Sequence, residues 1–328
     1  MIAILMCTYN GAQYLADQIE SILNQSIKDF KLYISDDGST DNTIQIIEEY
    51  EKKYPSQVKQ ISLDQKHNGA CMHFLKALKN KEIMSADYVM LSDQDDIWHA
   101  NKIEVTLSQM KQLEDKNGKD RPLLVYCDSE LVNDDGIIVA PSFMGFANYN
   151  ANKTTFSHIL IQNTVTGAAS MFNRALCELL EETPDKCMMH DHWIALIATG
   201  LGDVSYIDKQ LYSYRQHGDN VLGANKGGIY EEVIGFWGKR EGKRKKREEV
   251  RRQVRENYQR MIDQAGIFKE FFFDDLDLSK QKTISAFVNI SEKGPFARVW
   301  TLLKYNIVCD NWYRVIGQCL FFFRTSFS

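Results

Sequence analysis

Apolar runs alternate with helix-like segments through the first 130 residues. Ile2–Cys7 is a continuous apolar run, which is typical of a parallel strand buried on both faces. It is followed by Leu15–Leu23, where apolar residues recur at helical spacing. The same cycle predicts further strands at 32–35, 58–63 and 88–91, with helices between them. Such repeated units predict an α/β fold with a wound, mostly parallel sheet flanked by helices.

The alternation loosens after residue 123. A strand is predicted at 123–127, and the Asp-Asp-Gly turn within 134–139 predicts an antiparallel hairpin. The last hundred residues have the pattern of helices, highly charged at first and aromatic later. We therefore expect an α/β domain over 1–225 and a helical C-terminal region over 226–328. The remaining predicted elements are strands at 170–172, 204–207 and 211–214 and a helix at 190–199.

Polar and acidic residues follow the ends of three predicted strands. Thr8 and Asn10 follow the first strand, Asp36 and Asp37 follow the second, and the fourth runs into Asp93–Asp96. One such cluster alone is better explained by a turn, because Asp, Gly and Ser favour turns. Three clusters at the carboxyl ends of strands in one wound sheet predict a functional site.

Asp93, Asp95 and Asp96 place three carboxylates just past a buried strand. Oxygen ligands of this kind suit Mg²⁺ or Mn²⁺, which commonly share their coordination shell with phosphate oxygens. A solvated acidic turn is the alternative that the pattern leaves open. The chain has no G-x-x-x-x-G-K-[ST] and no G-x-G-x-x-G after the first strand, so a bound diphosphate would depend on a metal for charge neutralisation.

A second cluster is His190-Asp191-His192-Trp193. Zinc binding is disfavoured because residues i and i+2 of a helix point apart. We expect Asp191 to project into the site as a general base, with Trp193 packed beneath it. His217 follows a predicted strand, and a lone histidine is most often structural.

In order and approximate spacing, these motifs resemble those of family 2 inverting glycosyltransferases with the GT-A fold. The resemblance covers residues 1 to about 222, and the form of segment 92–98 looks most like the bacterial rhamnosyltransferases of surface polysaccharide synthesis. The motifs that carry it are Cys7-Thr8-Tyr9-Asn10, Asp36-Asp37-Gly38-Ser39-x-Asp41, Asp93-x-Asp95-Asp96, Thr166-Gly167 and His190-Asp191-His192-Trp193.

The resemblance implies a role for each matching residue. Asp191 would be the catalytic base, preceded by His190 where many members have Glu. The other implied sites are a nucleotide-sugar site of Thr8, Asn10, Asp36, Asp37 and Asp93, an acceptor-side group of Thr166, Gly167, His190 and Trp193, and a metal site of Asp93, Asp95 and His217 with Asp96 behind them.

The implied reaction is the inverting, metal-dependent transfer of a sugar to a hydroxyl of a lipid-linked glycan. The first choice of donor is dTDP-L-rhamnose, and a UDP-hexose is the alternative.

Two other classes of protein stay open. A sugar nucleotidyltransferase would ordinarily show a Gly-rich loop with a basic residue early in the chain, and Thr8–Tyr14 has no Lys or Arg. The other class is a non-catalytic protein that binds a membrane surface, and the support for it is the uneven distribution of charge along the chain.

Charged residues are unevenly distributed along the chain. The 328 residues carry a formal net charge of −5 and are 44% apolar, a soluble globular composition that excludes disordered and fibrous classes. Lys239–Arg260, the basic band, holds eleven Lys or Arg and four Glu, which gives +7 and leaves −12 for the rest. An anionic membrane surface or self-association is expected for the band. Nucleic acid is disfavoured because the total charge is negative and no recognition motif accompanies the band.

Cellular location follows from what the sequence lacks. The N-terminal residues have no signal-peptide pattern, and no apolar run approaches the ~18 residues of a membrane span. The seven widely spaced cysteines contain no C-x-x-C pair and are expected to be reduced. We expect a cytoplasmic protein that is peripheral on the inner face of the cell membrane.

Overall fold

The computed structural model describes residues 1–217 and 244–325. The described residues form two compact units. The first contains residues 1–146, 165–185 and 189–217, and the second contains 147–164, 186–188 and 244–325. The domain boundary at residue 225 stays a prediction, but the second unit includes two segments that precede it.

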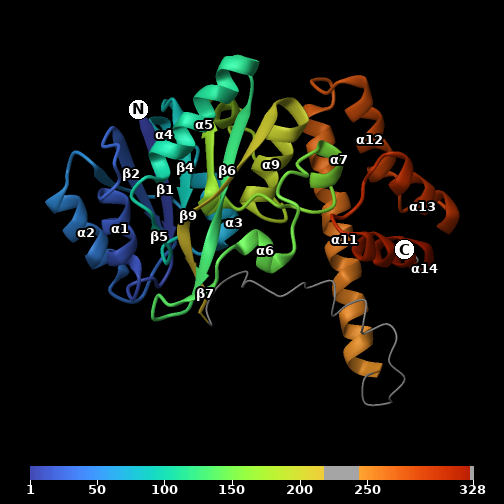
Figure 1. Cartoon of the computed structure of the whole chain (residues 1–328), viewed down its shortest axis with the longest axis horizontal. Coiled ribbons are helices and arrows are strands. Elements are labelled where there is room, and N and C mark those ends of the chain that lie inside the picture. The colour runs from blue at the N-terminus through green and yellow to red at the C-terminus, as the bar shows by residue number, and fades with distance from the viewer. Residues whose placement is uncertain (218–243, 326–328) are drawn as a thin grey trace. The chain divides into compact units, whose positions relative to one another are not determined.

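Unit one is built on a nine-stranded sheet in the described part of the chain (Figure 1). The strand order is β3-β2-β1-β4-β8-β6-β9-β5, with β7 beside β6. Strands β1 to β4 pair in parallel, as do β6 and β9, whereas β8 runs antiparallel to both β4 and β6. The strands are β1 Ile2–Thr8, β2 Phe30–Asp36, β3 Val58–Ile61, β4 Tyr88–Ser92, β5 Ile97–Trp98, β6 Leu123–Val132, β7 Ile138–Ala140, β8 Ser170–Asn173 and β9 Asp203–Arg215.

Helices cover this sheet, so the predicted α/β class is confirmed. Strands β6 and β9 contact both α5 and α9, and α3 contacts β1. Residues 123–129 of β6 are buried in succession, as expected for a strand that is covered on both faces. The helical elements are α1 Leu15–Leu23, α2 Thr43–Lys53, α3 Gly69–Ala77, α4 Lys81–Met84, α5 Lys102–Asn117, α6 Phe143–Ala147, α8 Arg174–Glu178, α9 His190–Leu201 and a 3₁₀ turn at Gly167–Ala169.

The prediction of two short strands between residues 204 and 214 is wrong, because β9 is a single strand. Ile207 and Gln210 pair with consecutive residues of β6, so residues 208–209 form a bulge. Both bulge residues are exposed and charged, and in the sequence they imitate a turn. The hairpin predicted at 134–139 is present as β6 and β7.

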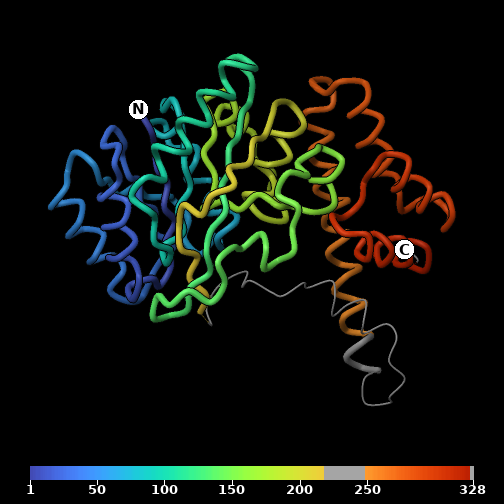
Figure 2. Tube along the Cα trace, viewed as in Figure 1, coloured from blue at the N-terminus to red at the C-terminus, as the bar shows by residue number. Residues whose placement is uncertain are grey.

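Unit two is helical where it is described, and the colours of Figure 2 follow the chain through it to the C-terminal helices. The expected helical C-terminal region is therefore present. No helix in the described ranges combines the length and the apolar character that a membrane span requires. The helices are α7 Phe156–Ile159, α11 Arg244–Phe272, α12 Leu278–Val288, α13 Pro295–Lys304 and α14 Trp312–Arg324.

A buried polar cluster ties residues 147–164 to the end of the chain within unit two. His158 Nε2 lies 3.0 Å from Asp310 Oδ1, and both side chains are fully buried. His158 Nδ1 donates to the carbonyl of Val308 at 2.9 Å. Gln162 Nε2 donates to the second Asp310 oxygen at 2.8 Å. The early segment is thus an integral part of this unit.

The basic band lies partly outside the described residues, since 239–243 are not described and the side chains of 244–247 are not either. Its described side chains, 248–260, carry four Arg and three Glu, a net charge of +1. Arg252 lies 3.8 Å from Glu256 and 4.0 Å from Glu249 on the exposed surface of α11. This part of the band is close to charge-balanced.

Candidate active site

The carboxyl ends of β1, β2 and β4 meet at one edge of the sheet. Thr8 at the end of β1 pairs in register with Asp36 at the end of β2. Burial raises the pKa of the Cys7 thiol well above its ordinary value, and the charges of Asp93 and Asp37 add to the rise. The polar and acidic residues at these three strand ends are therefore neighbours, as the sequence predicts.

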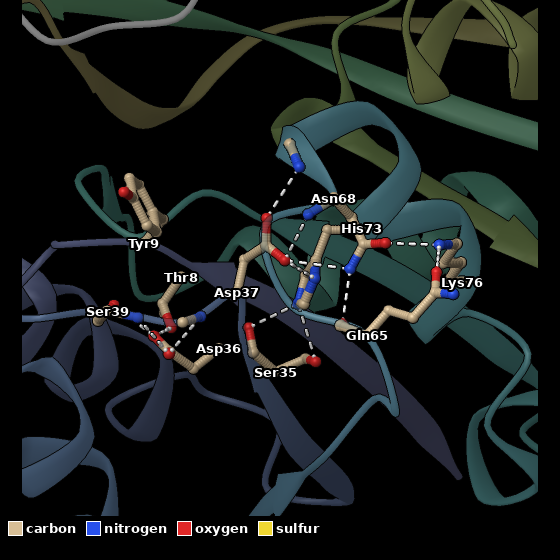
Figure 3. Close-up of polar contacts among 12 residues, drawn as sticks. Thr8, Tyr9, Ser35, Asp36, Asp37, Ser39, Gln65, Asn68, His73 and Lys76 are labelled. Carbon is tan, nitrogen blue, oxygen red and sulfur yellow. Dashed lines mark hydrogen bonds and ion pairs between the residues drawn. The ribbon is translucent and has the colours of Figure 1, made fainter.

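Asp36 organises the turn after β2. Its carboxylate accepts from Thr8 Oγ1 at 2.8 Å, from the backbone N–H groups of Gly38 and Ser39 at 2.9 and 2.8 Å, and from Ser39 Oγ at 2.5 Å (Figure 3). Asn10 has a positive φ of 48°, and its backbone N–H donates to Ser39 Oγ at 2.8 Å. Thr8 and Asp36 thus shape the loop, and the Thr8 side chain is buried.

Asp37 is held ionised by a different set of donors. Its Oδ1 accepts from Asn68 N at 2.9 Å and lies 3.0 Å from His73 Nδ1, and its Oδ2 accepts from Gly69 N at 2.8 Å (Figure 3). Burial favours the neutral acid, but these hydrogen bonds and the His73 ring outweigh it, so the pKa of Asp37 lies below 3.8. Among the described residues, only Gly69 donates to Oδ2, and a carboxylate oxygen has room for about two donors.

Four acids and His217 gather at the end of β4. His217 Nε2 lies 2.8 Å from Asp95 Oδ2, and both side chains are mostly buried. Burial, together with the charges of Asp95 and Asp191, raises the pKa of Asp93 to about 7. Asp96 is fully buried, and burial followed by the charges of Asp95 and Asp93 raises its pKa well above 3.8. The late residues Asp191 and His217 thus join the motif at 93–96.

Lys102 is a site residue that the sequence does not reveal. Its side chain is fully buried, and Nζ donates to the carbonyl of Ala168 at 2.5 Å. The ammonium also lies 3.8 Å from the ring centre of Trp98 and 4.2 Å from that of Tyr212. Burial lowers the pKa of Lys102 to about 8, although nearby acids, Asp96 among them, favour its charged form. A lysine in the first turn of a helix is usually exposed, so no sequence signal marks it.

Asp191 lies in the first turn of α9. The positive end of the helix dipole stabilises a carboxylate at that position. Gly167 N donates to Asp191 Oδ2 at 3.3 Å. Beside it, Thr166 Oγ1 lies 3.3 Å from the Tyr212 hydroxyl. The Thr166-Gly167 motif and the expected base therefore adjoin one another.

His190 supports this region as a neutral aromatic ring. It stacks on Phe74 with ring centres 4.2 Å apart, and burial lowers its pKa to about 3. A Cβ added to Gly167 would lie 2.7 Å from His190 Nε2, so only glycine fits without movement. Trp193 is fully buried, and its position beneath Asp191 stays a prediction.

Arg215 fixes the loop that carries Asp95. Its Nε donates to the carbonyl of Asp95 at 3.0 Å, and one terminal nitrogen donates to the carbonyl of Asp134 at 2.6 Å. The guanidinium lies 4.8 Å from the ring centre of Tyr14, which in turn lies 5.0 Å from that of His217. No motif in the sequence marks Arg215 or Tyr14, because their partners are distant in the chain.

Tyr9 presents an exposed ring at the end of β1. Its backbone exchanges two hydrogen bonds with the Gln94 side chain, at 2.9 and 3.1 Å. Tyr9 as a whole is 50% exposed. The signal that could have found it is an aromatic residue placed in a polar turn directly after a buried strand.

The donor set is suitable for part of a metal shell. Among the described residues, no group of three His, Cys, Asp or Glu side chains is assembled as a metal site. Asp95 Oδ2 and His217 Nε2, however, are 2.8 Å apart. Adjacent ligands of an octahedral ion with bonds of about 2.1 Å would be roughly 3 Å apart, so this pair fits one ion. Carboxylate oxygen in this set favours Mg²⁺ or Mn²⁺.

Comparison with known proteins gives consistent matches. The model of the family "Glycosyl transferase family 2" matches residues 3–118. The chain is 31% identical over 229 residues to the dTDP-rhamnosyl transferase RfbG of Shigella flexneri, which is 67% of this chain and 74% of that protein. It is 26% identical over 222 residues to the chondroitin synthase of Escherichia coli, which is 67% of this chain but 30% of that protein.

The fold also has a solved counterpart. The structure of S. aureus TarS 1–349 in complex with UDP has a TM-score of 0.50 and 17% sequence identity, covering 93% of this chain and 88% of that one. The GT-A type of fold expected from the sequence is thereby confirmed. The family match and the similarity to a dTDP-rhamnosyl transferase decide for a glycosyltransferase over a sugar nucleotidyltransferase or a non-catalytic binding protein. The chain belongs to glycosyl transferase family 2 and is a glycosyltransferase.

Proposed function

We propose that the protein transfers a sugar from a nucleotide sugar to an acceptor hydroxyl with inversion, using Asp191 as the general base. The observation that carries the proposal is the position of Asp191 at a helix N-terminus, close enough to Asp93 that its charge raises the pKa of that acid. The base is thus a neighbour of the strand ends where ligands bind in wound sheets.

The proposed step is a single displacement. Asp191 takes the proton of the acceptor hydroxyl as its oxygen bonds to the anomeric carbon. The bond between that carbon and the diphosphate oxygen breaks on the opposite face, which inverts the configuration. Asp95, His217 and Asp93 would hold a Mn²⁺ or Mg²⁺ ion, with Asp96 behind them. When bound, that ion would neutralise negative charge on the diphosphate.

The nucleotide is assigned to the ends of β1 and β2. Asp37 is ionised, and its Oδ2 has room to accept an N–H of a pyrimidine base. Thr8, Asn10 and Asp36 would hold the surrounding loop in shape. Thr166 and Gly167, with His190 and Trp193 behind them, would line the acceptor side.

The donor we propose is dTDP-L-rhamnose, with a UDP-hexose as the second candidate. The similarity to a dTDP-rhamnosyl transferase over 67% of the chain supports the first. The shared fold with a protein solved in complex with UDP supports the second. We propose a glycan on a lipid carrier as the acceptor and the cytoplasmic face of the membrane as the place of reaction.

Replacing Asp191 tests the base. Asp191→Asn should lower turnover by about 10²- to 10⁴-fold, since the amide cannot accept the proton. Calorimetric titration should show that dTDP-rhamnose binding is largely retained. Asp208→Asn is the matched control, because Asp208 lies exposed on the β9 bulge. Full activity in Asp191→Asn would contradict the assignment.

A further inference from the structure

Helices α13 and α14 expose large apolar side chains. Phe296 is 80% exposed and Trp312 is 76% exposed. On α13 the exposed residues recur at i, i+4 and i+7, and on α14 at i, i+4 and i+11, so each helix carries one stripe. The rings of Phe296 and Phe323, 5.0 Å apart, join the two stripes. We call this surface the α13–α14 face, and it consists of Phe296, Trp300, Leu303, Trp312, Ile316 and Phe323.

The opposite sides of these helices are buried and partly polar. Arg298 donates to the carbonyl of Ser291 at 2.8 Å, and Gln318 Nε2 donates to that of Ile307 at 3.0 Å. Arg314 is likewise buried within unit two. A helix that faces water normally has the reverse arrangement, with its apolar stripe inward. Because these hydrogen bonds fix the rotation of the helices, the apolar face cannot turn inward without leaving buried polar groups unsatisfied.

The charge around this face is positive. Residues 278–325 contain seven Lys or Arg and two acids, and when the buried Arg298, Arg314 and Asp310 are left out, five Lys or Arg and one acid remain, a net charge of +4. One of the two acids, Asp310, is fully buried beside His158. Helices α13 and α14 contain no acid, and Lys304 and Arg324 at their C-terminal ends are exposed. A second copy would bring the same positive charge to the contact, whereas an anionic lipid surface is complementary.

We propose that the α13–α14 face inserts into the interfacial layer of an anionic bilayer. The helices would lie in the membrane plane, with tryptophan and phenylalanine side chains among the headgroups and upper acyl chains. Lys304 and Arg324 would contact lipid phosphates. Contact with the membrane would bring the enzyme close to a lipid-linked acceptor. In assuming that acceptor, the inference rests on the proposed function. The surface is distinct from the basic band of α11.

Vesicle flotation of the full-length protein tests the proposal. The wild type should float with phosphatidylglycerol vesicles and much less with phosphatidylcholine vesicles. Trp300→Ser combined with Trp312→Ser should lower the partition by at least about tenfold, since two interfacial anchors are lost. Leu278→Ser is the matched control, because Leu278 is 73% exposed on α12 outside this face. Both mutated tryptophans are exposed, so the thermal unfolding midpoint should not change.

Each alternative has its own outcome. Unchanged flotation in the double variant, or a wild type that does not float, overturns the proposal. So does a wild-type dimer in analytical ultracentrifugation that the same substitutions dissociate. Loss of flotation on replacing Arg251, Arg252 and Arg255 by Gln, with the tryptophan variant still floating, would assign the contact to α11 instead. Transfer to a water-soluble acceptor without vesicles should be equal in wild type and double variant, so failure of the proposed function is detected separately.

Discussion

His190 makes the fold sensitive to acid. Its pKa of about 3 in the folded protein lies below the ordinary 6.5, so the unfolded chain takes up a proton first as the pH falls. The contribution of His190 to the free energy of unfolding is fully present above pH 6.5 and is lost progressively as the pH falls toward 3. At pH 5 the loss is about 2 kcal/mol.

The replacement His190→Phe keeps a ring against Phe74 and removes the titration. Urea unfolding at pH 7.5 and pH 5 should show that the variant loses about 2 kcal/mol less than the wild type over this interval. Equal losses in the two proteins would mean that His190 is not kept neutral by burial.

A methyl group added at Gly167 would disturb the candidate active site. Gly167→Ala would push against His190 Nε2, and the shift would pass to the N–H group that donates to Asp191. We expect kcat to fall by about 10- to 100-fold, because small displacements of a reacting group are costly. His190→Ala in the same chain should restore part of the rate. Gly266→Ala in α11 is the control, since an added Cβ there meets nothing within 4 Å.

At the scale of elements, Lys102 joins α5 to the 3₁₀ turn before β8. Lys102→Met removes the donor to Ala168 and leaves Asp96 buried without the attraction of the ammonium. We expect the free energy of unfolding to fall by roughly 3 kcal/mol. Lys116→Met on the exposed side of α5 should change it by no more than about 0.5 kcal/mol.

A double-variant cycle shows whether the two groups act together. Asp96→Asn with Lys102→Met should cost at least about 0.5 kcal/mol less than the sum of the single changes, as measured by urea unfolding. Strict additivity would show that the charge attraction contributes little and that the Ala168 hydrogen bond dominates.

The elements that could be predicted from the sequence are those whose pattern is local. The run Ile2–Cys7, followed by the polar residues Thr8 and Asn10, suffices to predict a buried parallel strand that ends in a polar turn. The antiparallel insertion of β8, the bulge at 208–209 and the burial of Lys102 depend on which strands become neighbours. For the same reason, the acid motif 93–96 could be proposed as a site from the sequence, whereas the hydrogen bonds from Arg215 to the carbonyls of Asp95 and Asp134 could not.

At the scale of the whole molecule, donor binding should raise stability by mass action. With dTDP-rhamnose at about a hundred times its dissociation constant, the gain is about 2.7 kcal/mol, seen as a higher melting temperature in the presence of Mn²⁺. UDP sugars at the same concentration should give a smaller rise, and Asp37→Asn should reduce both. A larger rise with a UDP-hexose would reassign the donor.

Residues 147–164 belong to the same unit as the C-terminal helices, which the sequence does not reveal because the loose pattern of this segment carries no information about its partner. Removing residues 226–328 would take away Val308 and Asp310, the partners of the buried His158. We expect the fragment 1–225 to bind a hydrophobic dye and to melt at a lower temperature than the full chain. A fragment as stable as the whole protein would contradict the assignment of residues 147–164 to the same unit as the C-terminal helices.

The contact between His158 and Val308 spans 150 residues of sequence, and this has a consequence for synthesis in the cell. Translation proceeds at about 5–20 residues per second, so the segment around His158 leaves the ribosome many seconds before its partners exist. During that interval its apolar and polar groups are exposed to chaperones and to other nascent chains. Slowing translation or depleting a ribosome-associated chaperone should therefore lower the yield of this protein more than that of a chain whose units are contiguous in sequence.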